Sequence, residues 1–284
     1  MQKLTMSIET ELHHMGITYT TLTLLQNKDG VSVWRVETKE NSYIIKYFDK
    51  AEHRREILNY QILTNLGIPT LNVVAHTASS IVIEDIKQSI YRLGTAEDMN
   101  DQKTASLLGM WYKTLHENGR EYANKHSLYD ECNHFTLENI SKIREQTGTS
   151  DLHVWAVIEE NFNALKSIAM KQPKTLTYND FYYTNLAVAR DNSSAIMFDY
   201  NLLGKGYVYA DIRNVCSSLG EEAKVAFLLA YGKYNEQEKA LDDVISPVVT
   251  LHFACQQEKF PSWAKHELEA VKEGKMLVAL KNLL

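Results

Sequence analysis

The sequence predicts an α+β protein with two parts, a small antiparallel β-sheet part followed by a larger, mainly helical part. Short apolar runs separated by turn residues occupy much of the first 86 residues. From residue 101 onwards, apolar residues mainly recur at the spacing typical of amphipathic helices. No stretch rich in Gly, Pro or Ser divides the helical part. We therefore expect an N-terminal part over residues 1–86 and a C-terminal part over residues 87–284.

Length and composition set broad limits on the function. The chain has 284 residues and a net charge of −6, which argues against nucleic-acid binding as its main function. No run of about 18 apolar residues suggests a membrane span. The three cysteines lie far apart in the sequence, so neither a disulfide framework nor a zinc cluster is expected. The first residues lack the apolar core of a signal peptide, so we expect a cytoplasmic protein. We expect it to be a monomer or a homodimer.

The first part of the chain is predicted to start with a helix and to continue as a meander of strands. Apolar residues recur at helical spacing over 4–15. Turn residues at Gln26–Gly30 and at 39–41 separate three β-rich runs, and a helix is expected over 51–66 before two more strands. The five expected strands are Thr20–Leu25, Val31–Thr38, Ser42–Phe48, Leu71–Ala75 and Ser80–Ile83.

Lys46 interrupts the third of these strands, which is otherwise apolar. A buried lysine is costly unless it is paired, so Lys46 either reaches solvent at a sheet edge or has an acidic partner. Glu52 and Glu56 on the following helix are the candidates, and Glu56 is favoured because it immediately precedes the apolar face of that helix. A strand lysine paired with a helix glutamate is the arrangement of kinases, where the lysine also holds the nucleotide α- and β-phosphates.

The change from strands to helices at Glu84-Asp85-Ile86 is where a hinge between two kinase lobes is expected. Backbone groups at Glu84 and Ile86 would there bind the adenine edge of a nucleotide. The Gln26–Gly30 turn occupies the position of a phosphate-covering loop, but it holds one glycine instead of three and is weak evidence by itself. Gly204-Lys205-Gly206 lacks the strand-to-helix context of a phosphate loop.

The second part of the chain is predicted to consist mainly of helices. The first contains the apolar positions of 105–115 and is expected to end near Gly119. Asp211 is expected near the cap of a later helix. Phe260 and Trp263 are interpreted as core or groove residues. The other expected helices are Thr136–Glu145, Asp151–Met170, Glu221–Tyr234, Glu236–Gln257 and Ser262–Leu283.

A polar loop and a predicted hairpin contain the main candidates for chemistry. Asp180 and Asn185 lie five positions apart, and the runs 186–189 and 195–198 flank a turn, so the hairpin would have Asn185 at its start and Asp199 at its end. Carboxylate and amide oxygens suit Mg²⁺. In kinases a catalytic Asp is followed after four residues by an Asn, and by a metal-binding Asp after the next strand pair. On these three positions alone, an ordinary hairpin with polar ends is the alternative.

Together these residues resemble the aminoglycoside phosphotransferase and choline kinase family, small-molecule kinases with a bilobal protein-kinase-like fold. The resemblance covers nearly the whole chain. It implies an ATP- and Mg²⁺-dependent phosphotransferase that acts on a hydroxyl of a small molecule, such as an amino-sugar or a choline-like amino-alcohol, and it leaves GTP possible in place of ATP. The residues that carry it are, in order, Lys46, Glu56, Glu84-Asp85-Ile86, Asp180, Asn185, Asp199 and Asp211.

The same resemblance implies a role for each residue. Lys46, held by Glu56, would bind the ATP phosphates. Asp180 would be the catalytic base that orients the acceptor hydroxyl, and Asn185 and Asp199 would hold Mg²⁺. Asp211 would brace the catalytic loop through hydrogen bonds.

Two departures from the family pattern keep other functions open. The family usually has His-Gly-Asp at the catalytic Asp, where this chain has Tyr178-Asn179-Asp180, and Trp-Glu after the metal-binding Asp, where this chain has Tyr200-Asn201. A nucleotide-binding regulator without transferase activity is therefore the alternative. A metal-dependent hydrolase that uses Asp180 and Asp199 is a third hypothesis, and it leaves Lys46 unexplained.

Five tyrosines cluster in the sequence around the predicted site. Such a density could form an aromatic box for a quaternary or protonated amine, although packing between elements is the more common use of tyrosine. The acceptor itself is not determined by the sequence. The five residues are Tyr182, Tyr183, Tyr200, Tyr207 and Tyr209.

Overall fold

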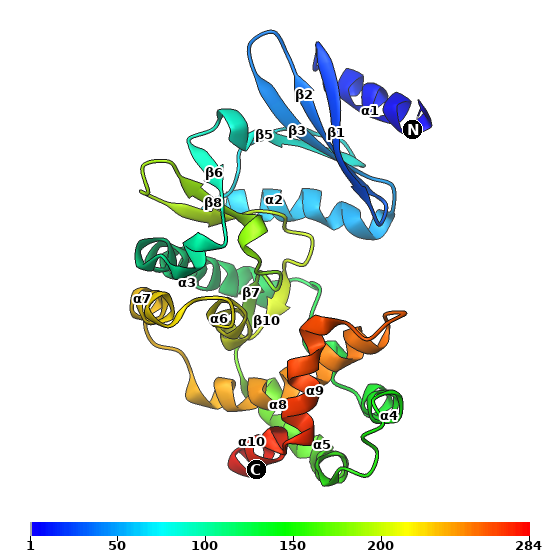
Figure 1. Ribbon diagram of the computed structural model, residues 1–284, viewed down its shortest axis with the longest axis vertical. Coiled ribbons are helices and arrows are strands. Elements are labelled where there is room, and N and C mark those ends of the chain that lie inside the picture. Colours follow the sequence, from blue (N-terminus) through cyan, green and yellow to red (C-terminus); the bar gives the residue numbers. More distant parts are fainter. Residues whose placement is uncertain (1) are drawn as a thin grey trace. The chain divides into compact units, whose positions relative to one another are not determined.

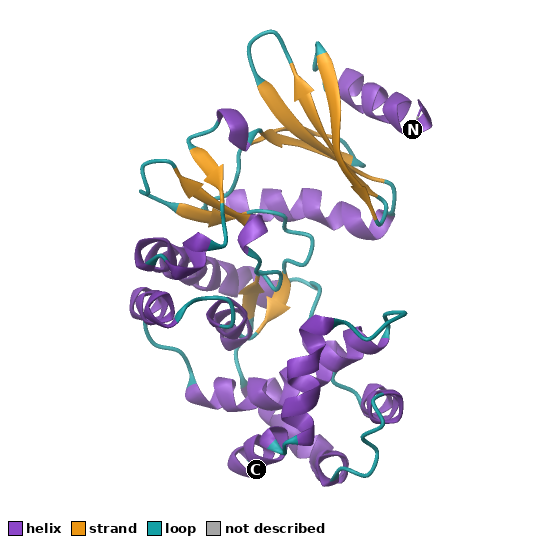
Figure 2. Cartoon of the chain, viewed as in Figure 1, coloured by secondary structure: helices purple, strands orange, loops and turns teal. Residues whose placement is uncertain are grey.

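The computed structural model describes residues 2–284 and confirms the predicted α+β class, with strands concentrated in the first part of the chain and helices after it (Figure 2). Contacts divide the chain into two compact units. The first comprises the chain up to Asn118 with Asp180–Leu203 and Val215–Gly232, and the second comprises Gly119–Asn179, Gly204–Asn214 and Lys233–Leu284. The lobe boundary predicted at residue 86 stays a prediction.

The first unit contains a five-stranded antiparallel sheet in the order β1-β2-β3-β5-β4. The central strand of this sheet is β3, the strand that contains Lys46. All five strands lie at or near their predicted positions. Their bounds are β1 Thr21–Lys28, β2 Val31–Glu37, β3 Ser42–Phe48, β4 Val73–His76 and β5 Ser80–Glu84.

Two helices accompany this sheet, α1 (Gln2–His14) and α2 (Arg55–Asn65) (Figure 1). Ile8 and Leu12 of α1 pack with Ile45 and other buried residues of the sheet. Because successive strand residues point to opposite faces, Lys46 lies on the other face from Ile45. The predicted helix 51–66 is present, but its first turn, Ala51–Arg54, is a 3-10 helix.

The turn between β1 and β2 is shorter than the sequence predicted. Gln26, Asn27 and Lys28 belong to β1 and pair with β2, so only Asp29 and Gly30 form the connection. Both have positive φ, 54° and 87°, as a two-residue type I′ hairpin turn requires. The predicted phosphate-covering loop is therefore a tight hairpin turn, because Asp-Gly supplies the two left-handed residues that this turn needs.

The rest of the first unit holds a second sheet in the order β6-β8-β9, in which β8 and β9 form the predicted hairpin. The strand β6 was not predicted, because its three residues are too few for an alternating pattern. The helix α3 continues past the predicted end at Gly119. A Cβ at Gly119 would lie 2.6 Å from the Leu176 side chain, so this glycine permits close packing and does not end the helix. The bounds are β6 Tyr91–Leu93, β8 Leu186–Ala189, β9 Ala195–Met197, α3 Gln102–Lys125 and α7 Glu221–Tyr231.

The second unit is mainly helical and is built around a core of buried side chains from its long helices, such as Trp155, Leu165 and Val244. It also holds a two-stranded sheet, β7 with β10, that was not predicted. Its elements are α4 Leu137–Gln146, α5 His153–Lys171, β7 Thr175–Thr177, β10 Gly204–Gly206, α6 Val208–Cys216, α8 Glu236–Cys255, α9 Lys265–Lys272 and α10 Lys275–Leu283.

Two predictions for the second part of the chain are wrong. The expected helix 262–283 is interrupted at Gly274, whose φ of 81° no right-handed helix allows. Phe260 and Trp263 are exposed, at 36% and 51%, because they lie on the connection before α9 and contribute little to the core. Asp211 lies in the first turn of α6, close to the predicted position, although the helix begins three residues earlier at Val208.

Among the helices of residues 2–284, none combines the length and the apolar character needed to cross a membrane.

Candidate active site

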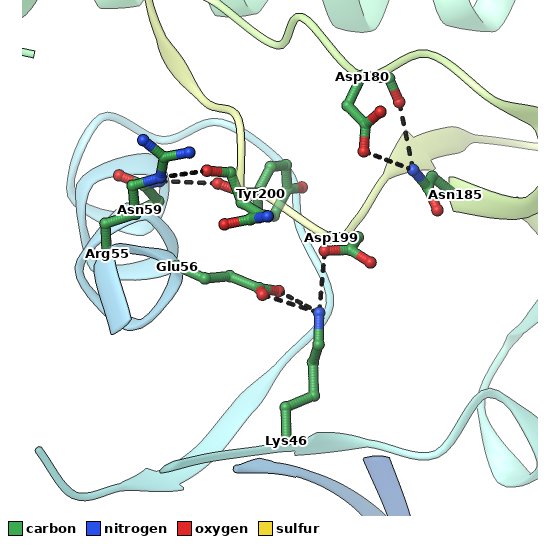
Figure 3. Close-up of polar contacts among 9 residues, drawn as sticks. Lys46, Arg55, Glu56, Asn59, Asp180, Asn185, Asp199 and Tyr200 are labelled. Atoms are coloured by element: carbon green, nitrogen blue, oxygen red, sulfur yellow. Dashed lines mark hydrogen bonds and ion pairs between the residues drawn. The ribbon is translucent and has the colours of Figure 1, made fainter. Parts of the chain in front are cut away.

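The seven residues predicted to bind the nucleotide, the metal or the acceptor proton all lie in the first unit: Lys46, Glu56, Glu84, Ile86, Asp180, Asn185 and Asp199. Asp211 belongs to the second unit. Lys46 lies on the central strand and is 8% exposed. It therefore does not reach solvent at a sheet edge, which was one of the two predicted alternatives. Its Nζ lies 2.6 and 2.8 Å from the two carboxylate oxygens of Glu56 and 2.9 Å from Oδ1 of Asp199 (Figure 3). One ammonium group therefore joins β3, α2 and the segment after β9.

The Lys46–Glu56 pair is the one that the sequence favoured. Glu56 lies in the first turn of α2 and is 1% exposed, whereas Glu52 lies on the preceding 3-10 turn and is exposed. A carboxylate in the first turn is also favoured by the helix dipole. Burial by itself lowers the pKa of Lys46, but the charges of Glu56 and Asp199 outweigh burial and raise this pKa above its usual range. Lys46 is thus a permanent cation at neutral pH.

Further residues of α2 hold the segment that contains Asp199, and the sequence analysis missed them. Arg55 Nε donates to the carbonyl oxygen of Asn201 at 2.6 Å, and Asn59 Nδ2 donates to the carbonyl oxygen of Tyr200 at 2.7 Å (Figure 3). The Tyr60 and Tyr200 rings meet edge to face, with centroids 4.8 Å apart. Asn59 could have been found from the sequence, because it lies on the apolar face of a predicted helix and a buried amide needs hydrogen-bond partners.

Asp199 follows the hairpin in a left-handed backbone conformation, with a φ of 64°. Asp adopts this conformation less readily than Gly, and here the contacts of Tyr200 and Asn201 hold it. The hairpin closes where Leu186 pairs with Met197, and the Phe198 N–H donates to the carbonyl oxygen of Asn185 at 2.9 Å. Asn185 and Asp199 thus lie at the two ends of one hairpin, as predicted.

Asn185 also contacts the predicted base. Its Nδ2 donates to the backbone carbonyl oxygen and to Oδ2 of Asp180, each at 3.2 Å. Burial, and next the nearby charge of Asp199, raise the pKa of Asp180 to about 6, while Asn185 and Lys46 oppose the shift. A carboxylate with this pKa is ionised at neutral pH and still accepts a proton readily, which suits a general base.

Asp211 braces the residues that precede Asp180 in the chain. It is 1% exposed, and its two carboxylate oxygens accept hydrogen bonds from the backbone N–H groups of Tyr178 at 2.8 Å and Asn179 at 2.9 Å. The predicted hydrogen bonds are therefore present. They arise although Asp211 lies inside a helix, because its side chain reaches across to the end of β7.

The departure from His-Gly-Asp has a backbone explanation. Asn179 has a φ of 65°, in the left-handed region where Gly is favoured and Asn is the best-tolerated alternative. Tyr178 is fully buried and fills space in place of the usual His. The chain therefore keeps, before Asp180, the left-handed backbone conformation that a glycine adopts readily.

The hinge residues are held by their neighbours in the sheet and by the hairpin. The Glu84 carboxylate accepts from the Asn72 N–H at 2.8 Å and the Ser89 hydroxyl at 2.6 Å, and Arg190 donates to the Ile86 carbonyl oxygen at 3.3 Å. The buried Asp85 between them accepts from Arg35 at 2.6 Å and Ser42 at 2.8 Å. The segment 84–86 is thus fixed through side chains, which leaves its role in binding adenine as a prediction.

The oxygens at the hairpin fit the predicted magnesium site. The Asn185 amide nitrogen is used by Asp180, so its Oδ1 stays available, and Asp199 uses Oδ1 for Lys46 while no described residue donates to its Oδ2. Mg²⁺ commonly takes one or two carboxylates together with substrate phosphates. Within residues 2–284, no group of three or more His, Cys, Asp and Glu could hold a metal ion. The hairpin thus offers two hard oxygens, Oδ1 of Asn185 and Oδ2 of Asp199.

The tyrosines divide into packing and exposed residues. Tyr200 is fully buried and Tyr207 is 2% exposed, and their hydroxyls donate to the carbonyl oxygens of Met197 and Ala169. These two residues therefore pack inside their own units. Tyr182 and Tyr183, next to Asp180 in the sequence, are 57% and 40% exposed, and remain available to an acceptor molecule.

Comparisons with known proteins identify the family and the fold of this chain. The family model described as "Phosphotransferase enzyme family" matches residues 23–244. No curated protein matches the sequence. The choline kinase LicA from Streptococcus pneumoniae has a similar structure, with a TM-score of 0.64, 13% sequence identity and coverage of 99% of each chain.

Two other solved structures extend the likeness. Spectinomycin phosphotransferase APH(9)-Ia, in complex with ADP and spectinomycin, has a TM-score of 0.61 at 13% identity, covering 99% of this chain and 98% of that one. The Plasmodium vivax ethanolamine kinase has a TM-score of 0.59 at 14% identity, covering 91% of this chain and 84% of that one. At these identities the likeness shows a shared protein-kinase-like fold. With the family match over most of its length, the chain belongs to the phosphotransferase enzyme family.

Proposed function

We propose that this protein transfers the γ-phosphoryl group of ATP to a hydroxyl of a small molecule, with Mg²⁺ and with Asp180 as the catalytic base. The observation that carries the proposal is the Lys46 ammonium, which contacts Glu56 and Asp199 at 2.6 and 2.9 Å. A lysine held in this way between a helix carboxylate and a metal-binding carboxylate is the arrangement that kinases need for activity.

Each residue has a role that its contacts support. Lys46 binds the ATP phosphates, Glu56 fixes its ammonium, and backbone groups of Glu84 and Ile86 bind the adenine edge. Asn185 and Asp199 hold Mg²⁺ through the oxygens described above, and the ion neutralises phosphate charge when it is bound. GTP is an alternative nucleotide.

Asp180 accepts the proton that the acceptor hydroxyl loses in the transfer. As the acceptor oxygen bonds to the γ-phosphorus and the bond to the β-phosphate oxygen breaks, the acceptor hydroxyl proton passes to the Asp180 carboxylate and ADP leaves. The Asn185 amide orients that carboxylate. Positioning and charge neutralisation supply most of the catalysis in such a transfer.

The acceptor is proposed to be a small amino-alcohol or amino-sugar. Structural neighbours include a choline kinase, an ethanolamine kinase and a spectinomycin phosphotransferase. The exposed rings of Tyr182 and Tyr183 could contact a cationic amine. The cytoplasmic location and the monomeric or homodimeric state stay predictions.

ADP release, measured with ATP or GTP, Mg²⁺ and a panel of choline, ethanolamine, spectinomycin and glucose, tests the proposal. We expect acceptor-dependent ADP release with at least one of them, lost by a factor of about 10² to 10⁴ in Asp180→Asn. The variant should still be stabilised thermally by ATP, because the nucleotide contacts remain. Stabilisation by ATP without turnover on any acceptor would instead support the nucleotide-binding regulator.

A further inference from the structure

A cavity of about 440 Å³ lies within the second unit, at the end of α5 and beside β10. None of the seven predicted site residues lines it. Lys166, Lys171, Lys174 and Lys205 do, and no Asp or Glu is among the described residues that line it. In a chain whose net charge is −6, this is a local concentration of positive charge without acidic residues in the wall.

Among the four lysines, Lys174 is the one for which the described residues provide a carboxylate partner. Its Nζ forms an ion pair with Asp130, which is not among the residues that line the cavity, and lies 5.0 Å from the centroid of the Tyr207 ring. The side chains of Lys174 and Asp130 are 18% and 11% exposed. Its charge is therefore already balanced by Asp130, and Lys174 mainly shapes the cavity.

Lys205 differs because its charge has no partner. Its backbone is fixed, since β10 pairs it with Leu176 and its N–H donates to the Tyr129 carbonyl oxygen at 2.6 Å. Its side chain is half-buried, and its ammonium has no ion pair or hydrogen bond with any residue of 2–284. An anion in the cavity would give this ammonium a partner that the described residues do not provide.

The two remaining lysines have an ordinary explanation as well. Lys166 and Lys171 are exposed and lie in the last two turns of α5, where positive side chains favour the helix dipole. They add attraction for an anion, but the argument depends on Lys205.

Apolar side chains also line the cavity. Phe135 and Tyr207 are 4% and 2% exposed, Ile245 is 5% exposed, and Met170 at the rim is 80% exposed. The Tyr207 ring is held because its hydroxyl donates to the Ala169 carbonyl oxygen at 2.8 Å. A ligand that contacts both the lysines and these apolar side chains would have an anionic end and an apolar body.

We propose that this cavity binds a small organic phosphate monoester, with its phosphate against Lys205 and its apolar body against Tyr207 and Phe135. A phosphate monoester is favoured over a carboxylate because three lysines around the cavity, Lys166, Lys171 and Lys205, have no carboxylate partner among the described residues. Lysine binds phosphate as a point charge, which suits a doubly charged oxyanion. The cavity takes no part in the proposed phosphoryl transfer. Its ligand is a molecule other than the substrates and products of that reaction.

Calorimetric titration of the full chain with phenyl phosphate tests the proposal. We expect wild-type protein to bind it, and Lys205→Gln to bind it at least about ten-fold more weakly, as expected for losing a hydrogen bond to a charged group. Lys205→Arg should retain binding. The matched control is Lys239→Gln, because Lys239 is also half-buried and lies 6.0 Å from the Tyr209 ring centroid, but it does not line the cavity.

Further arms locate the ligand. Saturating ATP with Mg²⁺ should leave the binding of phenyl phosphate unchanged, and phenol and inorganic phosphate should each bind more weakly than phenyl phosphate. The proposal is overturned if wild type does not bind, if Lys205→Gln binds normally, or if ATP displaces phenyl phosphate. Should Lys205→Gln fold poorly, the exposed Lys171→Gln replaces it, with a smaller loss of affinity expected. Because the readout is binding, its outcome is independent of whether any acceptor is phosphorylated.

Discussion

The two units of this chain place charged side chains in opposite ways. In the first, one buried ammonium, Lys46, lies between the carboxylates of Glu56 and Asp199, and Asp180 stands nearby. In the second, the lysines around the cavity greatly exceed their single carboxylate partner, Asp130. An excess of carboxylates calls for a cation such as Mg²⁺, and an excess of lysines calls for an anion. The local balance of charge therefore indicates ligands that the net charge of the chain conceals.

The largest effect on the first cluster is expected from Lys46→Met. Removing the ammonium leaves the Glu56 carboxylate buried and unpaired, which costs about 3 kcal/mol of unfolding free energy. Urea titration at pH 7 measures the change. Part of the loss should return in Lys46→Met/Glu56→Leu, because the double variant buries no lone charge. The control Lys50→Met, whose Nζ lies 3.9 Å from an exposed Glu52, should stay within about 0.5 kcal/mol of wild type. Wild-type stability in Lys46→Met would show that this cluster holds no buried charge.

The pH dependence of turnover comes next in size. Asp180 must be ionised to accept a proton, and its pKa is raised to about 6, first by burial and then by Asp199. We expect kcat/KM to fall about ten-fold per pH unit below about 6 and to level off above it. A profile measured from pH 4.5 to 8 with a saturating nucleotide checks this. A flat profile across that range would remove Asp180 from the role of base.

The same carboxyl has the opposite effect on stability. Its pKa rises from an ordinary value of 3.8 in the unfolded chain to about 6 in the folded one, so the unfolded state binds fewer protons between these values, and stability falls as pH rises through this window. Asp180→Asn should therefore be more stable than wild type by about 1–2 kcal/mol at pH 7, less than full burial would give because the side chain is partly exposed. The gain should vanish below about pH 4. A constant gain at both pH values would contradict the shift.

The smallest effect is expected at Asn179, which adopts a left-handed conformation. Asn179→Gly should keep kcat within about three-fold of wild type, because Gly accepts this backbone freely. Asn179→Ala should lose about 1 kcal/mol of stability, because a Cβ without a compensating polar group is strained there. Thermal melting and acceptor-dependent ADP release measure the pair of variants. Equal stability of the Gly and Ala variants would mean that the backbone relaxes.

Local patterns in the sequence predicted much of the fold and of the site. The strands around Lys46 and the hairpin 186–197 have short apolar runs between turn residues, and these signals need no distant partner. The Lys46–Glu56 pair was predictable because the two residues are ten positions apart on adjacent elements. The three-residue strands β6, β7 and β10 were missed, because they exist only through pairing with strands far along the chain.

The sequence by itself determined the α+β class, the family resemblance and the residues that could conduct phosphoryl transfer, because propensity, periodicity and motif spacing are local properties. Only the tertiary structure decided that Arg55 and Asn59 fix the backbone after Asp199, that Asp180 has a raised pKa, and that Lys205 is left without a partner. Burial, electrostatic fields and unpaired charges depend on which distant segments meet, and the order of residues does not specify those meetings directly.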